Sequence, residues 1–385
     1  MGAARIAEAL AKCGDEVEVV SLHPHPVETL EETNGIPVHR LPIDNLFWTS
    51  MSQKPNLVMR SLWHLRDIWN QTAAARIGRI LDRVRPDVVN THNLTGISIS
   101  VWGEAKKRGL RVVHTMHDYY LLCVRSTLYR YGRTCEKRCM ICDHAKRRHF
   151  EWSGKIDCAV SVSRFLLNQH TERAYFPGTP TTVIRPIVSL ERKLQAEPRK
   201  ADSDVLTFGF IGQVIEEKGI VDLLEATRRL PAKNWRLKIA GSGKTHFVAQ
   251  LQKRFPDPRI EFLGFCKQYE FYDAVDVVVV PSRWPEPLGI IPMECFAANR
   301  SLICARVGGL PEMTELGTVV RMFRPTDVDD LAAAMNEALQ DADRWRTGGF
   351  LDPDGDREYS ADFVARRYHD VFLGQVAKNA DPPRL

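Results

Sequence analysis

The sequence lacks the features that would place it across a membrane or outside the cell. No apolar run approaches the roughly 18 residues of a membrane-spanning helix. The opening, MGAARIAEALAKCGDEVEVV, is typical of an amphipathic helix followed by a strand, without the continuous apolar core of a signal peptide. No basic stripe with interleaved aromatic residues is present, which argues against a nucleic-acid partner. We therefore expect a cytoplasmic globular protein.

A complete ATP-binding loop is also missing. The stretch WRLKIAGSGKTHF contains GSGKT, but the Walker A pattern G-x-x-x-x-G-K-[ST] needs a glycine where the chain has Lys238. The stretch still predicts a strand, a tight glycine turn and a helix, and such turns present backbone N–H groups to anions. We interpret it as a nucleotide-facing turn of another kind.

Charge of neither sign is in large excess, because 53 Lys and Arg oppose 48 Asp and Glu, a formal net charge of +5. Basic clusters at 106–111 and 145–150 could meet phosphates or an anionic membrane surface, although solvated helix ends explain them equally well. A predicted helix at 57–84 carries apolar residues at helical spacing, so it could touch a membrane or simply pack on a sheet. Peripheral association with the inner face of the membrane is therefore a hypothesis.

Nine cysteines in a chain without a secretion signal indicate reduced thiols. Four of them, Cys123, Cys135, Cys139 and Cys142, follow the spacing C-x11-C-x3-C-x2-C. This pattern could form a structural zinc site of four thiolates that orders a long loop. Free buried thiols are the alternative interpretation.

The order of the predicted elements indicates an α/β protein. At 385 residues the chain is too long for one ordinary core, and the alternation of strands and helices predicts parallel sheets covered on both faces. We expect a Rossmann-like domain at 1–187, a polar linker at 188–204, a second Rossmann-like domain at 205–356, and a terminal segment at 357–385 whose helix packs toward the first domain. The predicted strands lie at 16–21, 37–41, 87–92, 111–116, 158–163, 181–185, 206–212, 235–240, 259–263, 276–281 and 301–305. The predicted helices lie at 3–13, 57–84, 96–108, 164–175, 219–230, 245–255, 267–274, 327–340 and 357–378, with another from about 289.

One strand is missing from its expected place. A doubly wound domain begins with a strand whose turn feeds the first helix, whereas this chain opens with GAAR and the helix itself. That strand is normally central, so its absence would expose two neighbouring strand edges. We expect a truncated or misassigned start.

The stretch VVVVPSRWPEPLGIIPMECFA, residues 277–297, carries the most chemical information. A buried strand precedes Glu286, and a helix is expected from Gly289, with Pro292 in its first turn. Glu286 and Glu294 are separated by seven residues across this turn, so both could face one ligand while the intervening amides hold its phosphates. Alternatively, the first is a loop carboxylate and the second a solvated helix residue.

Three further turns follow strands of the same predicted sheet. FIGQVIEEKG at 210–219 places Lys218 at a helix start, where its charge could neutralise a diphosphate. The turns GSGK at 241–244 and VGGLPE at 307–312 follow other strands. Because carboxyl ends of parallel strands meet at one edge, we expect these turns to converge on one crevice.

Together these motifs resemble glycosyltransferase family 4 (group 1), a family with the GT-B fold of two Rossmann-like domains facing a cleft. The matching motifs are EPLGIIPME, preceded by PSRW, together with GQVIEEKG, GSGK, GGLPE and HTMHDYYLLC. The resemblance extends over essentially the whole chain from residue 2. It implies transfer of a sugar from a nucleotide-diphospho sugar to an acceptor hydroxyl, with retention of configuration.

The resemblance implies a role for each matching position of the second domain. Lys218 would bind the nucleotide diphosphate, Glu294 the ribose hydroxyls and Glu286 the donor sugar, while the base would stack near Phe265. The implied donor-binding set is Gly212, Gln213, Lys218, Gly241, Gly243, Phe265, Glu286, Leu288, Gly289, Ile290, Ile291 and Glu294. The helix start and Lys218 would stabilise the leaving diphosphate, so no metal or other cofactor is expected in catalysis.

In the first domain the resemblance implies an acceptor side made of Gly2, His117 and Asp118. His117 would lie near the sugar, so the implied catalytic residues are His117, Lys218 and Glu286. Outside this family context, a histidine before an aspartate at a strand end often only caps the strand.

One departure from the family concerns the diphosphate, because Gln213 stands where the family usually has an arginine, and a neutral amide binds an anion more weakly than a guanidinium. Arg283 or Arg306 could replace that charge.

The expected activity is that of a hexosyltransferase in glycan, polysaccharide or glycolipid biosynthesis, with UDP or GDP in the donor. Its partners would be a nucleotide sugar and a glycan, lipid-linked or small-molecule acceptor. A sugar epimerase or phosphorylase of the same fold is one alternative. A catalytically inactive nucleotide-sugar-binding subunit is the other, and Gln213 together with the missing strand motivates it.

Overall fold

The computed structural model describes residues 2–48, 55–187, 205–350 and 357–375, which form two compact units. The first unit contains the described residues up to Leu128, then Cys135–Ile187, and then those from Tyr359 onward. The second contains Tyr129–Thr134 and the described residues from 205 to Glu358. The hairpin 129–134 is thus grouped with the second unit, although in sequence it lies within the first. The expected linker, 188–204, lies outside the described residues.

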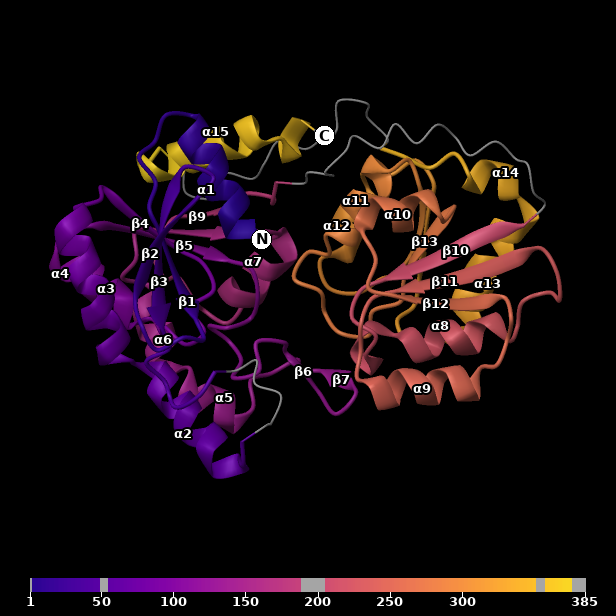
Figure 1. The fold of residues 1–385 in the computed structure, drawn as a ribbon, viewed down its shortest axis with the longest axis horizontal. Coiled ribbons are helices and arrows are strands. Elements are labelled where there is room, and N and C mark those ends of the chain that lie inside the picture. Colours follow the sequence, from indigo (N-terminus) through magenta and orange to yellow (C-terminus); the bar gives the residue numbers. More distant parts are fainter. Residues whose placement is uncertain (1, 49–54, 188–204, 351–356, 376–385) are drawn as a thin grey trace. The chain divides into compact units, whose positions relative to one another are not determined.

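The first unit contains two separate sheets (Figure 1). One has the order β1-β3-β2, with β1 parallel and β2 antiparallel to β3; the other is parallel with the order β4-β5-β8-β9. The strands are β1 Val19–His23, β2 Thr29–Thr33, β3 Ile36–Pro42, β4 Val88–Thr91, β5 Arg111–Met116, β8 Cys158–Ser161 and β9 Thr181–Val183. The helices are α1 Gly2–Lys12, α2 Leu57–Ile68, α3 Gln71–Val84, α4 Ser100–Lys107, α5 Met140–Ala145, α6 Arg147–Ser153, α7 Arg164–Thr171 and α15 Ala361–Phe372. Strands β1 and β4 are therefore edge strands.

The prediction of a single helix at 57–84 is wrong, because the chain forms two helices there. Helix α2 ends at Ile68 and α3 begins at Gln71. The side chain of Asn70 caps α3 by accepting a hydrogen bond from the Ala73 N–H at 3.1 Å, and its own N–H donates to Ser98 Oγ at 2.8 Å. A buried side-chain cap of this kind stops one helix and starts the next.

Helices cover both faces of the four-stranded sheet. Ile6 and Leu10 of α1 and Tyr368 of α15 form one core cluster with Val113 of β5 and Val160 of β8. Figure 1 shows α1 and α15 side by side, and the two helices are in contact. Helix α4 contacts the same sheet through β5 and also packs against α3. Within the described residues no helix has the length and apolar character needed to cross a membrane.

The second unit is built on one six-stranded parallel sheet with the order β12-β11-β10-β13-β14-β15. Its strands are β10 Leu206–Ile211, β11 Trp235–Ala240, β12 Ile260–Gly264, β13 Val277–Val280, β14 Ser301–Ala305 and β15 Val320–Phe323, and the hairpin strands are β6 Tyr129–Arg130 and β7 Arg133–Thr134. Its helices are η1 Glu216–Lys218, α8 Ile220–Thr227, α9 Thr245–Arg254, α10 Gln268–Asp273, α11 Ile291–Ala297, α12 Leu310–Thr314, α13 Val328–Gln340 and α14 Ala342–Trp345, followed by η2 Arg357–Tyr359.

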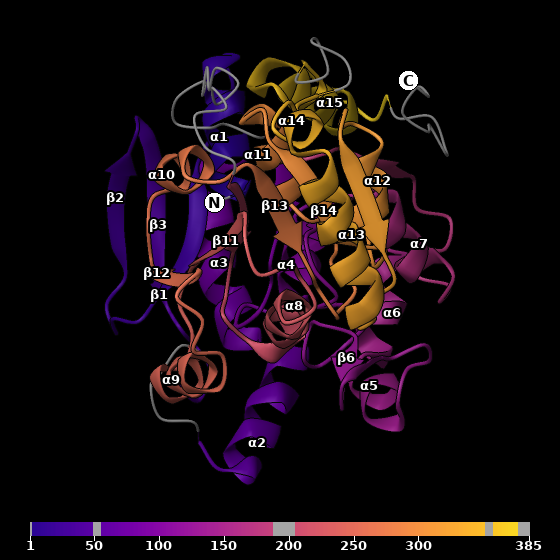
Figure 2. The same cartoon turned by 90° about the vertical axis from the view of Figure 1, so that its right-hand side faces the viewer.

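Both faces of this sheet are covered, which explains why its central strands are apolar along their length. On one face Phe208 and Phe210 pack in a core with α8 and α13, which Figure 2 shows in front of the sheet. On the other face a side chain at Gly209 would collide with Phe271 of α10 and with Val275. The parallel order brings the carboxyl ends of β10, β11, β13 and β14 to one edge of the sheet.

Candidate functional site

The carboxylate of Glu286 is held in the loop between β13 and α11. Its Oε1 accepts from Lys218 Nζ at 2.6 Å, from Ser282 Oγ at 2.7 Å and from Trp284 Nε1 at 2.9 Å. Glu286 is buried. These three hydrogen-bond donors fix the orientation of the carboxylate in the loop.

Lys218 reaches Glu286 because two strand ends are packed backbone to backbone. Gly219 has φ +74°, and a Cβ at this position would lie 1.7 Å from the Pro281 carbonyl oxygen. Only glycine tolerates both the positive φ and this approach. The turn after β10 is therefore pressed against the end of β13, and the Lys218 ammonium also lies over the Trp284 ring, 4.9 Å from its centroid.

Glu294 lies on α11 and is also oriented by two side chains. Gln268 Nε2 donates to its Oε1 at 2.8 Å, and the Tyr272 hydroxyl donates to its Oε2 at 2.9 Å. Burial, together with the charge of Glu294, raises the pKa of Tyr272 well above its usual value, so this hydroxyl stays protonated and remains a hydrogen-bond donor. Glu294 is a buried carboxylate, not a solvated helix residue.

The glycine turns predicted from the sequence pack on one another. A Cβ on Gly241 would lie 1.7 Å from the Gly212 carbonyl oxygen, and one on Gly243 would lie 2.3 Å from that of Val214. The Gly309 N–H donates to the Glu286 carbonyl at 2.7 Å, which ties the turn after β14 to the Glu286 loop. These close approaches indicate that the glycines of the GSGK and GGLPE turns allow neighbouring strand ends to pack closely.

The remaining predicted donor-binding residues surround this edge with different exposure. Gln213 is exposed, and Phe265 is 89% exposed in the turn after β12. Leu288 is buried, and Gly289 has φ +87°. The helix expected near Gly289 begins two residues later, at Ile291, so Ile290 precedes it.

Arg283, which could supply the charge that Gln213 lacks, is paired with acidic side chains. Its guanidinium makes a bidentate pair with Asp222 and a further ion pair with Glu216 at 3.0 Å. The replacement of that charge by Arg283 or by the exposed Arg306 stays a prediction.

Sequence reasoning missed the side chains that hold the two glutamates. Ser282 and Trp284 stand four and two positions before Glu286 within PSRWPE, so their proximity could have suggested a role. Gln268 and Tyr272 lie on another helix, 26 and 22 positions from Glu294, and no local pattern points to them.

In the first unit His117 follows β5 and pairs with His92, which follows β4. His92 Nδ1 and His117 Nε2 are 2.8 Å apart, and the rings stack with centroids 5.1 Å apart. Burial lowers the pKa of His117 to about 4 and that of His92 well below its usual value, so both rings are neutral near pH 7. A Cβ on Gly2 would lie 3.5 Å from His117 Cε1, so the start of α1 lies against this ring.

Asp118 follows His117 in the chain after β5. Its Oδ1 accepts the Tyr120 N–H at 2.7 Å, and its Oδ2 lies 3.4 Å from Asn93 Nδ2. Burial raises the pKa of Asp118. The structure thus places Gly2 against His117, with Asp118 next in the chain, and adds His92 and Asn93, which the sequence motifs did not indicate. The acceptor-side role of these residues stays a prediction.

The cysteine loop contains two buried thiols, Cys123 and Cys142, whereas Cys139 is exposed. The hydrogen bond between the two buried thiols lowers the pKa of Cys123 and raises that of Cys142. Among the described residues no group of three or more His, Cys, Asp or Glu side chains is placed to hold a metal ion. The structural zinc site, which would also need Cys135, stays a prediction.

Comparison with known proteins identifies the family. Residues 2–186 match the family described as Glycosyl transferase 4-like domain, and residues 191–348 match Glycosyl transferases group 1. A similar relative is an uncharacterized 42.6 kDa protein in the cps region of Klebsiella pneumoniae, 29% identical over 369 residues, which are 96% of this chain and 94% of the relative.

Solved structures share the fold. Sucrose-phosphate synthase from Thermosynechococcus elongatus matches with a TM-score of 0.72 at 19% identity, covering 96% of this chain and 92% of that one. The Anabaena protein HepE in complex with UDP and glucose matches with a TM-score of 0.61 at 15% identity, covering 88% and 86%. This chain therefore belongs to the group 1, GT4-like glycosyltransferases and has their GT-B fold.

Proposed function

We propose that this glycosyltransferase moves a sugar from a UDP-sugar to a hydroxyl group of a polysaccharide or glycolipid acceptor, with retention of configuration. The observation that carries the proposal is the Glu286 carboxylate, whose Oε1 binds three hydrogen-bond donors while its Oε2 has no partner among the described residues. A hydroxyl of the donor sugar is the proposed partner of that oxygen.

Lys218 is proposed to bind the diphosphate. An ammonium carries three N–H donors, and Glu286 takes one of them in the described structure, so two remain for phosphate oxygens. Because Glu286 and the Trp284 ring fix its position, this positive charge is already in place when the leaving diphosphate develops negative charge.

Glu294 is proposed to bind the ribose hydroxyls. Gln268 and Tyr272 each donate a hydrogen bond to one of its oxygens, which orients this buried carboxylate. Carboxylate oxygens accept hydrogen bonds from hydroxyl groups such as those of a ribose. The choice of UDP is supported by the HepE complex, which contains UDP and glucose. The choice of a polysaccharide acceptor is supported by the relative encoded in a cps region.

The first unit is proposed to supply the acceptor side. His117 is neutral near pH 7, and its Nε2 is engaged with His92, so Nδ1 is the ring nitrogen available to a sugar or acceptor hydroxyl. Asp118 lies beside it in the chain. We expect the enzyme to act in the cytoplasm, at the inner face of the membrane.

A thermal-shift panel of UDP-, GDP- and ADP-sugars tests the donor site. At a hundredfold excess over the dissociation constant, binding should stabilise the fold by about 2.7 kcal/mol. We expect this shift with UDP-sugars and a smaller one in Glu294→Gln, which keeps the shape of the side chain but removes its charge.

Product analysis separates transfer from the alternatives. Transfer to a glycan acceptor with the anomeric configuration of the donor supports the proposal. Binding without transfer or hydrolysis would identify an inactive subunit, and conversion of the nucleotide sugar without an acceptor would identify an epimerase. A shift with GDP-sugars alone would overturn the choice of base.

A further inference from the structure

The first unit carries an unusual concentration of exposed apolar side chains on α2 and α5. Of the fourteen large apolar side chains that are most exposed among the described residues, seven lie on these two helices. They are Leu57, Val58, Met59, Leu62 and Leu65 of α2 and Met140 and Ile141 of α5. The two helices are in contact, so these residues form one surface, called here the α2–α5 surface. Figure 1 shows both helices at the same end of the unit.

The apolar side chains of α2 point outward. Trp63 and Asp67 are the buried residues of this helix. At 3.6 residues per turn, Val58, Leu62 and Leu65 lie on the opposite side. Trp63 donates through Nε1 to the Phe47 carbonyl at 3.0 Å, which fixes the rotation of the helix. The exposed stripe is therefore a built feature of α2 and leaves a leucine-rich face without a partner in the described structure.

The same surface is positively charged. Helix α2 and residues 136–151 together carry seven Lys or Arg and four Asp or Glu, a net +3 out of the +5 of the whole chain. Three of the four carboxylates are already engaged. Asp67 is buried and accepts from the Gly96 N–H and the Tyr120 hydroxyl, and Asp143 pairs with Arg138 at 2.9 Å. Lys146 is buried as well, and Arg138 is the partner of Asp143, so five Lys or Arg and two Asp or Glu remain, and one of these two, Glu151, pairs with Arg147. The charge that faces solvent is thus mainly cationic.

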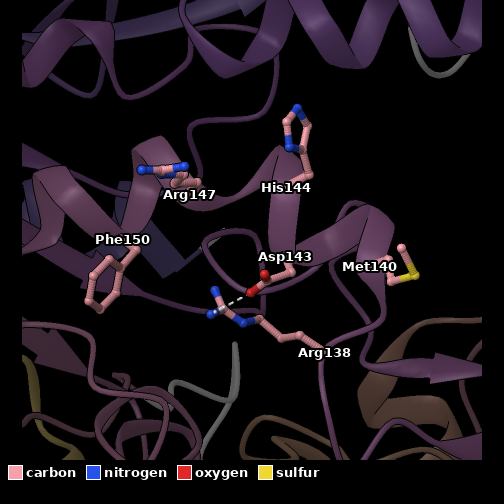
Figure 3. A pocket seen from close by; sticks show the side chains of 6 residues that line it. All are labelled: Arg138, Met140, Asp143, His144, Arg147 and Phe150. Atoms are coloured by element: carbon pink, nitrogen blue, oxygen red, sulfur yellow. Dashed lines mark ion pairs between the residues drawn. The ribbon is translucent and has the colours of Figure 1, made fainter.

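A pocket of about 510 Å³ lies at the edge of this surface (Figure 3). Its lining residues are Arg138, Met140, Asp143, His144, Arg147 and Phe150. The Arg147 side chain is 79% exposed and makes one ion pair within the described part of the chain, at 3.3 Å with the half-exposed Glu151, so it can turn toward an anion. Met140, itself 89% exposed, joins the pocket to the apolar face.

We propose that the α2–α5 surface docks on an anionic phospholipid bilayer. The leucines and Met140 would enter the boundary between headgroups and acyl chains, and the arginines and lysines around them would bind lipid phosphates. A second copy of the chain fits less well, because a two-fold interface would place one net +3 surface against another. The inference deepens the proposed location at the membrane and does not depend on the transfer chemistry.

Vesicle sedimentation with the purified full chain tests the proposal. We expect binding to phosphatidylcholine vesicles that contain phosphatidylglycerol, weak binding to phosphatidylcholine alone, and a loss of binding as salt is raised. The substitutions Leu62→Glu and Leu65→Glu should each lower the partition coefficient roughly tenfold or more, because each removes one apolar side chain from the lipid contact. Arg60→Glu with Arg147→Glu should remove the preference for the anionic lipid.

Leu30→Glu on β2 is the matched control, because Leu30 is 63% exposed and Leu65 is 61% exposed. The control should bind vesicles as the unaltered chain does. Unchanged melting temperature and unchanged hydrolysis of nucleotide sugar in solution would show that the α2 variants keep their fold and donor site. Failure of the unaltered chain to bind anionic vesicles would overturn the proposal. So would equal binding by the α2 variants, or a dimer in light scattering that Leu65→Glu dissociates.

Discussion

The ammonium of Lys218 lies 2.6 Å from Oε1 of Glu286, although 68 positions separate the two residues in the chain. The contact exists because Gly219 permits the turn after β10 to approach the carbonyl of Pro281. A cation and a carboxylate that the sequence places in different motifs are thereby joined in one site. The first prediction follows from this pair.

Lys218→Gln should lower turnover with a nucleotide sugar by about a hundredfold, because it removes a preorganised charge from the leaving diphosphate. The fold should survive, since Glu286 keeps its hydrogen bonds from Ser282 and Trp284. Steady-state kinetics and thermal unfolding measure the two effects. Lys253→Gln, near the exposed end of α9, is the control and should behave as the unaltered chain. Full activity of the Lys218→Gln variant would show that the Lys218 ammonium does not stabilise the leaving diphosphate.

Tyr272→Phe should weaken UDP binding several-fold, because Glu294 loses the hydroxyl that orients its Oε2 and one hydrogen bond is worth about 1 kcal/mol. We expect KM to rise more than kcat falls, since the ribose does not react. Calorimetric titration with UDP gives the affinity directly. The control is Tyr269→Phe on the same helix, whose hydroxyl contacts only Glu270 among the described residues. Equal affinities in the two variants would contradict the role of Tyr272.

Gly219→Ala should destabilise the second unit by roughly 3 kcal/mol or more, because its Cβ would lie 1.7 Å from the Pro281 carbonyl oxygen. Gly264→Ala provides a matched comparison. Gly264 also has a positive φ, +68°, but a Cβ there would meet no atom within 4 Å. The Gly264→Ala substitution should lower the free energy of unfolding by only about 1 kcal/mol, through backbone strain. Denaturant unfolding of both variants separates the effect of the steric collision from that of backbone strain. Equal losses in the free energy of unfolding would mean that backbone strain alone accounts for the destabilisation by Gly219→Ala.

His170 should make the first unit less stable in acid. It is fully buried, its Nδ1 lies 2.8 Å from the Leu166 carbonyl oxygen, and its Nε2 has no hydrogen-bond partner among the residues that the structure describes. Burial lowers its pKa from 6.5 to about 4, so the unfolded chain binds the extra proton first as the pH falls. The free energy of unfolding should therefore be fully retained above pH 6.5 and fall as the pH drops toward 4, by up to about 3 kcal/mol.

The variant His170→Leu isolates this contribution, because it removes the titrating group and keeps an apolar side chain of similar size. Urea unfolding above pH 6.5 and near pH 5 should show a smaller loss of stability in the variant than in the unaltered chain. An identical loss in both would assign acid sensitivity to other groups, such as His114, whose pKa burial lowers to about 3.

Local patterns predicted most regular elements and indicated the candidate site residues. Apolar runs bounded by turns indicated β10, β13 and β14 correctly, because a strand buried on both faces is apolar throughout. β11 was also indicated correctly, by the alternation of apolar residues with Arg236 and Lys238 before its glycine turn. Short elements were missed. Examples are β2, whose five residues are all exposed, and α5 and α6 within the cysteine loop. Their sequences carry no apolar periodicity of the kind that identifies a buried helix or strand.

By itself the sequence determined the family, the α/β fold, and the candidate residues Lys218, Glu286 and Glu294, because each of these depends on residues close together in the chain. Only the tertiary structure decided what these residues contact. It placed Lys218 on Glu286, engaged Arg283 with Asp222, and gave Glu294 the support of Gln268 and Tyr272. It also turned the leucines of α2 outward. Such contacts arise where parallel strand ends and neighbouring helices meet, and no pattern along one segment specifies its partner in another.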